Sequence, residues 1–152
     1  MQRLTRRSPA PSRLAVQRVA RGAPTTRVLL RSARAAASAG MHATLRVVGT
    51  AEGRRLNRAF RGRDYATNVL SFAYGLGHGD IVLCHPVIAR EAREQGKTLQ
   101  AHYAHMVVHG LLHLGGLDHV RRDDAERMER REIRILRSLG FGNPYQVKAA
   151  VK

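Results

Sequence analysis

Four segments of the chain have the residue pattern of β-strands. Residues 14–20 alternate apolar and polar side chains with a period of two, as a half-buried strand does. Residues 42–48, 68–74 and 79–84 are rich in valine, isoleucine, leucine and aromatic residues. A glycine-containing segment separates the last two, which favours a turn between them. The pattern therefore predicts four strands.

The segments between and after these strands have a helical period instead. In residues 25–38 the apolar residues recur three or four positions apart, which is the spacing of one helix face. Gly40 follows this segment and would end the helix, and Thr25 or Thr26 can cap its start. We predict five helices in all, over residues 25–38, 51–60, 86–95, 98–114 and 123–139.

Local signals mark the ends of the later helices. Pro86 suits the first turn of a helix, and Thr98 can act as an N-cap. Asp123 and Glu126 are three residues apart, which is the spacing of a capping box. Gly140 ends the last helical segment. These signals set the predicted boundaries.

The order of these elements, without an internal repeat or a linker, predicts one α+β domain. We place this domain at residues 13–146 of the 152-residue chain. Residues 1–12 contain several arginines together with proline and serine, and are expected to form a basic flexible tail. Residues 147–152 are expected to form a C-terminal tail.

Composition adds a strong charge to this outline. The chain has 27 Lys and Arg against 11 Asp and Glu, so its formal net charge is +16. Such a field attracts polyanions, above all nucleic acid. A basic protein that merely belongs to an acidic assembly would have the same composition. The charge thus predicts contact with RNA or DNA but no particular chemistry.

The cysteine content and the hydropathy of the chain limit the compartment and the partners that we expect. Cys84 is the only cysteine, so no internal disulfide is possible, and the chain fits a reducing compartment such as the bacterial cytoplasm. Its strand-like surroundings predict a buried thiol rather than a nucleophile. No apolar run reaches the ~18 to 20 residues that span a bilayer, so we expect no membrane partner. The arginine-rich start, which lacks acids, is also compatible with a cleaved targeting segment.

The segment HGLLHLGGLDH, residues 109–119, carries the candidate chemistry. His109 and His113 are four residues apart, so on a helix they project from one face. The two glycines at 115 and 116 can end the helix in a sharp turn and return His119 to that face. Three imidazoles can hold one zinc ion and leave its fourth position open, as in catalytic sites. A trio of hydrogen-bonded core histidines is the alternative.

This spacing is also that of the zinc-peptidase pattern H-E-x-x-H-x-x-G-x-x-H, including a glycine at position 116. One residue differs. Gly110 occupies the position at which such peptidases carry their general-base glutamate. The missing carboxylate counts against peptide cleavage.

Three segments together resemble the YbeY family of bacterial zinc-dependent endoribonucleases. They are HMVVHGLLHLGGLDH, NRAFRGRDYATNVLSF and GDIVLC. The resemblance implies a small mixed β-sheet packed against helices, with a zincin-like site of three histidines at the end of a helix. It implies single-strand-specific hydrolysis of RNA, maturation of the 3′ end of the small-subunit (16S) ribosomal RNA, and ribosome quality control. The implied partners are precursor ribosomal RNA and the small ribosomal subunit with its proteins.

The resemblance also assigns residues. His109, His113 and His119 match the three ligands of one Zn²⁺ per chain, and Arg61 matches an arginine needed for activity. The planar guanidinium of Arg61 suits the oxygens of a phosphate. On composition alone, Arg61 would be read as one more solvated surface charge.

Other candidates come from the residues themselves. Asp118 adjoins a ligand and could orient it or accept a proton, although it could equally cap the turn. His105 lies one turn before His109 and could line the site or be a partly buried helix residue. Ser71, with Thr67 and Asn68, could bind the substrate or only end a strand.

The other histidines, His42, His78, His85 and His102, are expected at the surface. The residue that acts as general base is left open. The 2′-hydroxyl of RNA could also itself be the nucleophile. Two other functions also stay open: a zinc hydrolase of another substrate, with a peptidase the first candidate, and a non-catalytic ribosome-assembly factor with a structural zinc.

Overall fold

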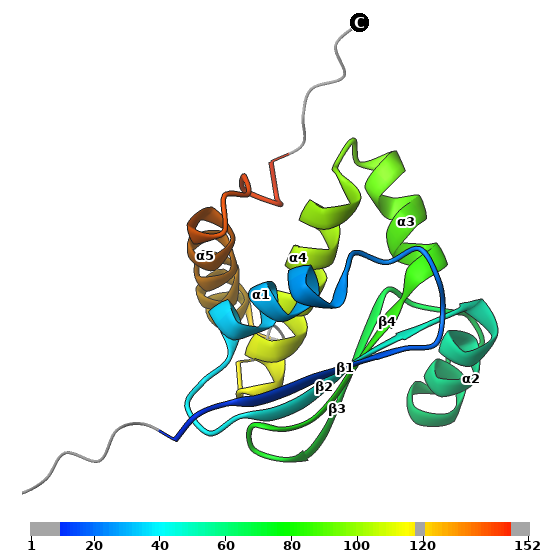
Figure 1. Ribbon diagram of the computed structural model, residues 1–152, viewed down its shortest axis with the longest axis horizontal. Helices are drawn as coiled ribbons and strands as arrows, with labels where there is room; N and C mark the ends of the chain where they lie inside the picture. The colour runs from blue at the N-terminus through cyan, green and yellow to red at the C-terminus, as the bar shows by residue number, and fades with distance from the viewer. Residues whose placement is uncertain (1–9, 118–120, 147–152) are drawn as a thin grey trace, which may run out of the picture.

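The computed structural model describes residues 10–117 and 121–146 of the chain. Its centre is a four-stranded mixed sheet with the order β1-β2-β4-β3. The neighbouring strands β1 and β2 are parallel, as are β2 and β4, whereas β3 runs antiparallel to β4 and forms one edge (Figure 1). The strands are β1 (Arg13–Arg18), β2 (His42–Val48), β3 (Val69–Gly75) and β4 (His78–Cys84).

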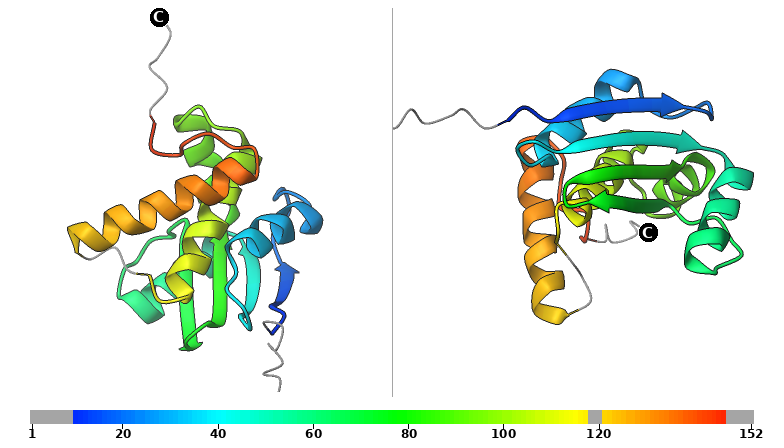
Figure 2. Two further views of the ribbon diagram at one scale, coloured as in Figure 1. Left: turned by 90° about the vertical axis from the view of Figure 1, so that its left-hand side faces the viewer. Right: turned by 90° about the horizontal axis from the view of Figure 1, so that it is seen from below.

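Five helices complete the described part of the chain. The central helix α4 and its neighbour α1 cover one face of the sheet, and α5 packs against the outer side of α4 (Figures 1 and 2). Seen from below the sheet, α2 and α5 lie at opposite ends of the strands (Figure 2). The helices are α1 (Thr26–Ala36), α2 (Thr50–Arg61), α3 (His85–Glu94), α4 (Leu99–Leu114) and α5 (Arg122–Ser138).

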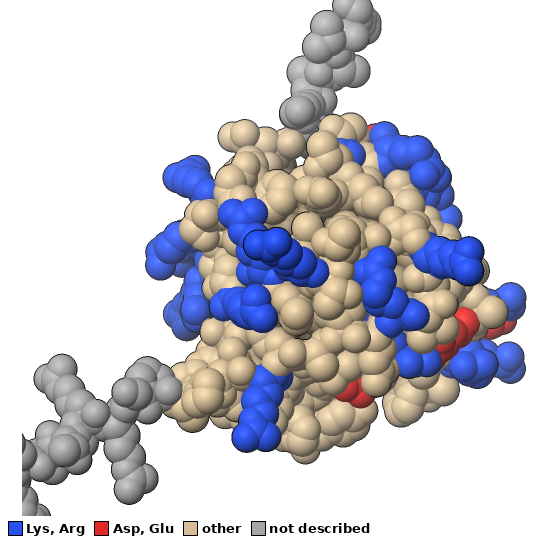
Figure 3. Space-filling model, in the orientation of Figure 1, with Lys and Arg blue, Asp and Glu red and all other residues tan. Residues whose placement is uncertain are grey.

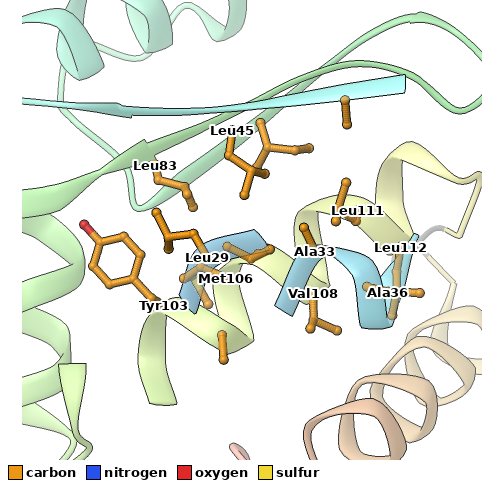
Figure 4. Close-up of a cluster of buried hydrophobic side chains, with 14 of the residues drawn as sticks. Leu29, Ala33, Ala36, Leu45, Leu83, Tyr103, Met106, Val108, Leu111 and Leu112 are labelled. Carbon is orange, nitrogen blue, oxygen red and sulfur yellow. The ribbon is translucent and has the colours of Figure 1, made fainter. Parts of the chain in front are cut away.

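The main core lies between the sheet and the helices α1 and α4. Leu45 of β2 and Leu83 of β4 point from the sheet toward Leu29 of α1 and Leu111 of α4 (Figure 4). All four side chains are buried. Burial of a side chain of this size stabilises a protein by roughly 1.5–3 kcal/mol. This core fixes α4, which carries the candidate histidines.

The opposite face of the sheet is covered only in part. Val48, Val82 and Cys84 form a smaller apolar cluster there, with Leu56 of α2 packed against it. Cys84 is buried, as its strand-like surroundings predicted. Among the described residues, no helix is long and apolar enough to cross a membrane.

The predicted α+β class, the mixed sheet and its packing against helices are confirmed. Each predicted strand and helix is present, with ends displaced by at most two residues. The side chains of Thr25 and Thr98 cap α1 and α4 by accepting from the backbone N–H three residues later. The predicted capping box of α5 is wrong. This helix begins one residue earlier, and its N-cap is Arg121, which makes no capping hydrogen bond through its side chain.

Helix α4 comes unusually close to β4 at Gly110. A Cβ atom at this position would lie 2.8 Å from Cγ2 and 3.3 Å from Cδ1 of Ile81. Ile81 is fully buried, so it has no free space into which it can move. A glutamate side chain therefore does not fit at residue 110. The absence of the peptidase glutamate is a packing requirement of this fold.

We predict that Gly110→Ala destabilises the protein although alanine favours helices. The gain in helix propensity is at most about 1 kcal/mol. Overpacking against Ile81 costs about 1–3 kcal/mol. The free energy of unfolding in urea should therefore fall by about 1 kcal/mol, which is the middle of the range for overpacking less the full gain in helix propensity.

Two backgrounds test the cause. In Ile81→Ala, which lacks Cγ2, Gly110→Ala should become neutral or stabilising. In Ile81→Val, which keeps an equivalent methyl group, the loss should persist. Equal effects in both backgrounds would show that this contact is not responsible.

Candidate functional site

A cleft of about 250 Å³ lies beside the edge strand β3. Its walls come from the end of α2, the segment that leads into β3, β3 itself and α4. The described residues that line it include Arg61 and Arg63 and no acidic side chain, a combination that suits an anion. The lining residues are Asn57, Arg61, Arg63, Tyr65, Thr67, Asn68, Val69, Leu70, Ser71, His109 and His113.

His109 and His113 reach this cleft from the last turns of α4, as their spacing predicted. Nδ1 of His109 lies 2.7 Å from Oε1 of Glu132, and Nδ1 of His113 lies 3.0 Å from the backbone oxygen of Leu117. A carboxylate or carbonyl oxygen only accepts, so each Nδ1 carries the proton. Nε2 of each ring is then the nitrogen whose lone pair can bind a metal.

Glu132 of α5 is the centre of a buried hydrogen-bond network. It is fully buried, and its second oxygen accepts from Nε2 of His105 at 2.8 Å and from the hydroxyl of Tyr145. Burial alone would raise the pKa of this carboxyl group. The hydrogen bonds from His105, His109 and Tyr145 outweigh burial and hold the pKa at about 2. Glu132 is therefore an anion at neutral pH and fixes the ring of His109.

The donors on α4 fit a zinc ion. Neutral imidazoles with Nδ1–H bound to a carboxylate or a carbonyl are the usual arrangement around zinc. The third predicted ligand, His119, and its neighbour Asp118 lie outside the described residues. Within residues 10–117 and 121–146 no group of three metal-binding side chains is found. The described residues therefore contribute two members of the predicted site.

Arg61 is the last residue of α2 and lines the same cleft as the two histidines. Gly62 follows it with φ +66°, a left-handed conformation that favours glycine and reverses the chain. Two contacts then fix the segment that leads to β3. Asn57 donates to the backbone oxygen of Tyr65 at 2.7 Å, and Arg54 pairs with Asp64 at 2.8 Å. These contacts fix the backbone on either side of Arg61, which places this residue at the edge of the cleft.

The polar candidates at the start of β3 also line the cleft. Ser71 donates to the backbone oxygen of Gly110 at 3.3 Å, which ties the edge strand to α4. Asn68 donates to Glu91 of α3 at 3.1 Å. His102 of α4 contacts the same carboxylate at 3.0 Å. Glu91 thus connects a cleft residue to two helices.

Two histidines of α4 are buried and lie outside the cleft lining. His105 is bound to Glu132 and Tyr145 rather than exposed to the cleft. His102 is only 2% exposed, so the prediction that it lies at the surface is wrong. Its bond to Glu91 compensates for its burial only in part. His85 is only half-buried and its Nδ1 lies 2.6 Å from the hydroxyl of Tyr103, whereas His42 and His78 are exposed as predicted.

Sequence reasoning missed Glu132 and Asn57. Glu132 lies four residues after Met128 and four before Leu136, so it belongs to the apolar stripe of α5. A charged residue within such a stripe is a signal for a buried partner. Asn57 similarly interrupts the buried face of α2. These positions could have been found from the helical period alone.

Fold and cleft together define a small α+β protein with a cationic, histidine-containing cleft at one edge of its sheet. Residues 18–140 match the family described as Endoribonuclease YbeY, and the chain belongs to this family. This confirms the resemblance found in its motifs.

Curated relatives named Endoribonuclease YbeY show the same relation. The protein of Aromatoleum aromaticum is 57% identical over 125 residues, which are 80% of this chain and 81% of the relative. That of Bordetella pertussis is 59% identical over 112 residues, or 70% of this chain and 71% of the relative. That of Azoarcus sp. is 52% identical over 134 residues, which cover 81% of this chain and only 53% of the relative.

A solved structure supports the fold. The solution structure of TM1509 from Thermotoga maritima superposes with a TM-score of 0.53 and 22% identity. The match covers 89% of this chain and 99% of that protein. At this identity the likeness concerns the fold alone.

We predict that Glu132→Ala strongly destabilises the protein, because the bonded side chains of His105 and Tyr145 would lose their buried partner. The expected loss is about 3–5 kcal/mol in the free energy of unfolding, measured in urea. Glu129→Ala is the matched control on the exposed side of the same helix, and should change it by about 0.5 kcal/mol or less. Equal losses in both variants would contradict the role of Glu132.

We predict an acid-sensitive contribution to stability from His102. Burial lowers the pKa of His102, and the hydrogen bond that His102 donates to Glu91 only partly opposes this effect. The folded protein therefore favours the neutral ring. The stabilisation is fully present above the unfolded pKa of about 6.5 and is lost as the pH falls below it.

The measurement is urea unfolding at several pH values between about 7.5 and 5. His102→Gln should lower the stability at neutral pH but reduce its decline toward acid. His42→Gln, at an exposed histidine, should leave the decline unchanged. If His102→Gln declines as steeply as the unmodified protein, His102 is not the group responsible.

Proposed function

We propose that this protein is a single-strand-specific endoribonuclease that hydrolyses RNA phosphodiester bonds with one zinc ion per chain. The observation that carries the proposal is the position of Arg61, His109 and His113 on the walls of one cleft, whose described lining residues include no acidic side chain. The names of its curated relatives support an RNA substrate. The proposed ligands of the zinc ion are His109, His113 and His119.

The residues of the cleft have different roles in the proposed reaction. Arg61 binds the non-bridging oxygens of the phosphate and stabilises the charge that develops on them during hydrolysis. Thr67, Asn68 and Ser71 supply further polar groups to the same cleft. Glu132 accepts from Nδ1 of His109 and so fixes the orientation of that ring. A zinc ion on such imidazoles supplies Lewis-acid activation of an oxygen nucleophile and neutralises phosphate charge.

Exposed aromatic residues near the cleft favour single-stranded RNA. Tyr65 lines the cleft and is 52% exposed, and Phe60, next to Arg61, is 66% exposed. Phe60 also packs edge-on against Phe72 of β3 at 4.8 Å. Unpaired bases can stack on such rings, whereas bases within a duplex cannot. This arrangement supports the proposed preference.

We further propose that the substrate is the precursor of the 16S ribosomal RNA at its 3′ end, in the bacterial cytoplasm. Small ribosomal subunits and their proteins are then the partners, and ribosome quality control is part of the role. Membership of the YbeY family supports this assignment. The large net positive charge suits a partner rich in phosphate.

Gly110 argues against the peptidase alternative. This residue packs against Ile81 with no room for a side chain, so the general base of zinc peptidases has no place here. A peptide library that is cleaved while RNA stays intact would favour the peptidase. A structural zinc in a non-catalytic assembly factor predicts that His113→Ala unfolds.

We predict that Arg61→Ala keeps bound zinc but slows RNA cleavage by about 10²–10³-fold, because a charged donor to the phosphate is lost. His113→Ala should stay folded but lose both zinc and cleavage. The measurements are zinc content by mass spectrometry, thermal unfolding, and cleavage of end-labelled single-stranded precursor RNA.

Arg55→Ala is the matched control, since Arg55 lies on the same helix and does not line the cleft. It should cleave at the unmodified rate. Unchanged cleavage by His113→Ala would overturn the proposal and indicate a contaminating nuclease.

A further inference from the structure

Two rows of arginine lie on neighbouring helices away from the cleft. On α1, Arg27, Arg31 and Arg34 are spaced four and then three residues apart, so they share one face. On α5 the same spacing recurs at Arg127, Arg131 and Arg134. All six side chains are exposed. We call these six residues the arginine face.

The two rows border one surface. Helices α1 and α5 are in contact, and Arg131 lines a hollow together with Ala35 and Ala36 at the end of α1. In the space-filling view, blue side chains gather over α1 in the centre and along α5 at the left edge, with no red atoms between them (Figure 3). The cleft is formed by other elements, namely α2, β3 and the last turns of α4.

The charges of the arginine face are not neutralised. None of the six arginines forms an ion pair with an acidic side chain in the described part of the chain. Helix α1 contains no acidic residue, and the first one in the chain is Glu52. On α5, Glu126 pairs with Arg122, and Glu129 lies close enough to Tyr145 to act on it.

Placing six like charges on one surface costs free energy through repulsion, which an anionic partner removes. Exposed arginines that do not serve an internal ion pair therefore indicate a ligand with several negative charges. The planar guanidinium also binds phosphate oxygens in pairs. The spacing of each row, seven residues of helix, spans roughly 10 Å, which is longer than one phosphate group.

The residue types on α1 and α5 favour duplex RNA over single-stranded RNA as the ligand of the arginine face. Neither α1 nor α5 contains an aromatic residue, so no base can stack there. Proteins bind double-stranded RNA mainly through its phosphates and its shape. The exposed ring of Tyr65 instead lines the cleft, and Phe60 is the chain neighbour of the cleft residue Arg61.

We propose that the arginine face binds the phosphate backbone of double-helical RNA while the cleft takes a single strand. This inference rests on the proposed function for the identity of its polyanion. A structured RNA would then be held by its helix on α1 and α5 and cleaved in an unpaired segment elsewhere.

The test compares three variants of the full chain. R27Q/R31Q/R34Q removes the row on α1, and R27K/R31K/R34K keeps its charge. R55Q/R90Q/R93Q removes three exposed arginines from α2 and α3 and is the matched control. The probe is a fluorescent RNA duplex of about 20 base pairs, and binding is followed by anisotropy between about 50 and 200 mM salt.

We expect the glutamine variant of α1 to bind the duplex at least about tenfold more weakly, with the slope of log affinity against log salt reduced by about 2–3. The lysine variant should keep most of the affinity. The control should lose about threefold at most, through the smaller net charge. Equal losses in the glutamine variant and the control, or no loss in either, would overturn the proposal.

Two further measurements distinguish duplex binding from membrane binding and from a role in cleavage. Vesicles that contain phosphatidylserine should bind no more weakly to the glutamine variant than to the control. If the glutamine variant loses vesicle binding but keeps its affinity for the duplex, the arginine face is a membrane-binding surface and the proposal is overturned. The glutamine variant should also cleave a short single-stranded RNA at the unmodified rate. If the unmodified protein cleaves no RNA but its duplex binding still depends on the arginines of α1, the proposed function is wrong. The inference that the arginine face binds duplex RNA is then still supported.

Discussion

The arrangement of the site depends on one buried carboxylate. Glu132 has lost all contact with water, and transfer of an isolated charge into such an environment is very costly. Its oxygens therefore need donors, which come from His105 and His109 of α4 and from Tyr145 after α5. These bonds lock α5 against α4 in one register. They also set which nitrogen of His109 bears the proton, so packing and site chemistry have the same cause.

Gly110 imposes the complementary constraint on the other side of α4. The helix approaches β4 so closely that a Cβ atom would collide with Ile81, and Ser71 of the edge strand bonds to the backbone of Gly110. This approach brings the cleft residues of β3 beside His109 and His113. It also excludes the carboxylate that a peptidase would use. A histidine spacing shared with peptidases is thus compatible with phosphodiester chemistry here.

The sequence alone predicted nearly all of the secondary structure, because its period and its end signals are local. Thr25 and Thr98 cap helices as expected, whereas the spacing of Asp123 and Glu126 failed because α5 starts at Arg122. The environment of single side chains was harder to predict. His102 is buried because Glu91 from another helix supplies its partner, and no local pattern encodes that contact. Glu132 was missed among the many charges of α5, although its place in the apolar stripe was visible.

X-ray absorption at the zinc edge of the metal-loaded protein measures the ligands of the proposed zinc ion. We predict three imidazole nitrogens at about 2.0–2.1 Å and no sulfur ligand. His119→Ala, like His113→Ala, should lose the zinc, whereas Glu132→Gln should leave the ligand types unchanged. A sulfur ligand from Cys84, or zinc retained by His113→Ala with an unchanged spectrum, would contradict this prediction.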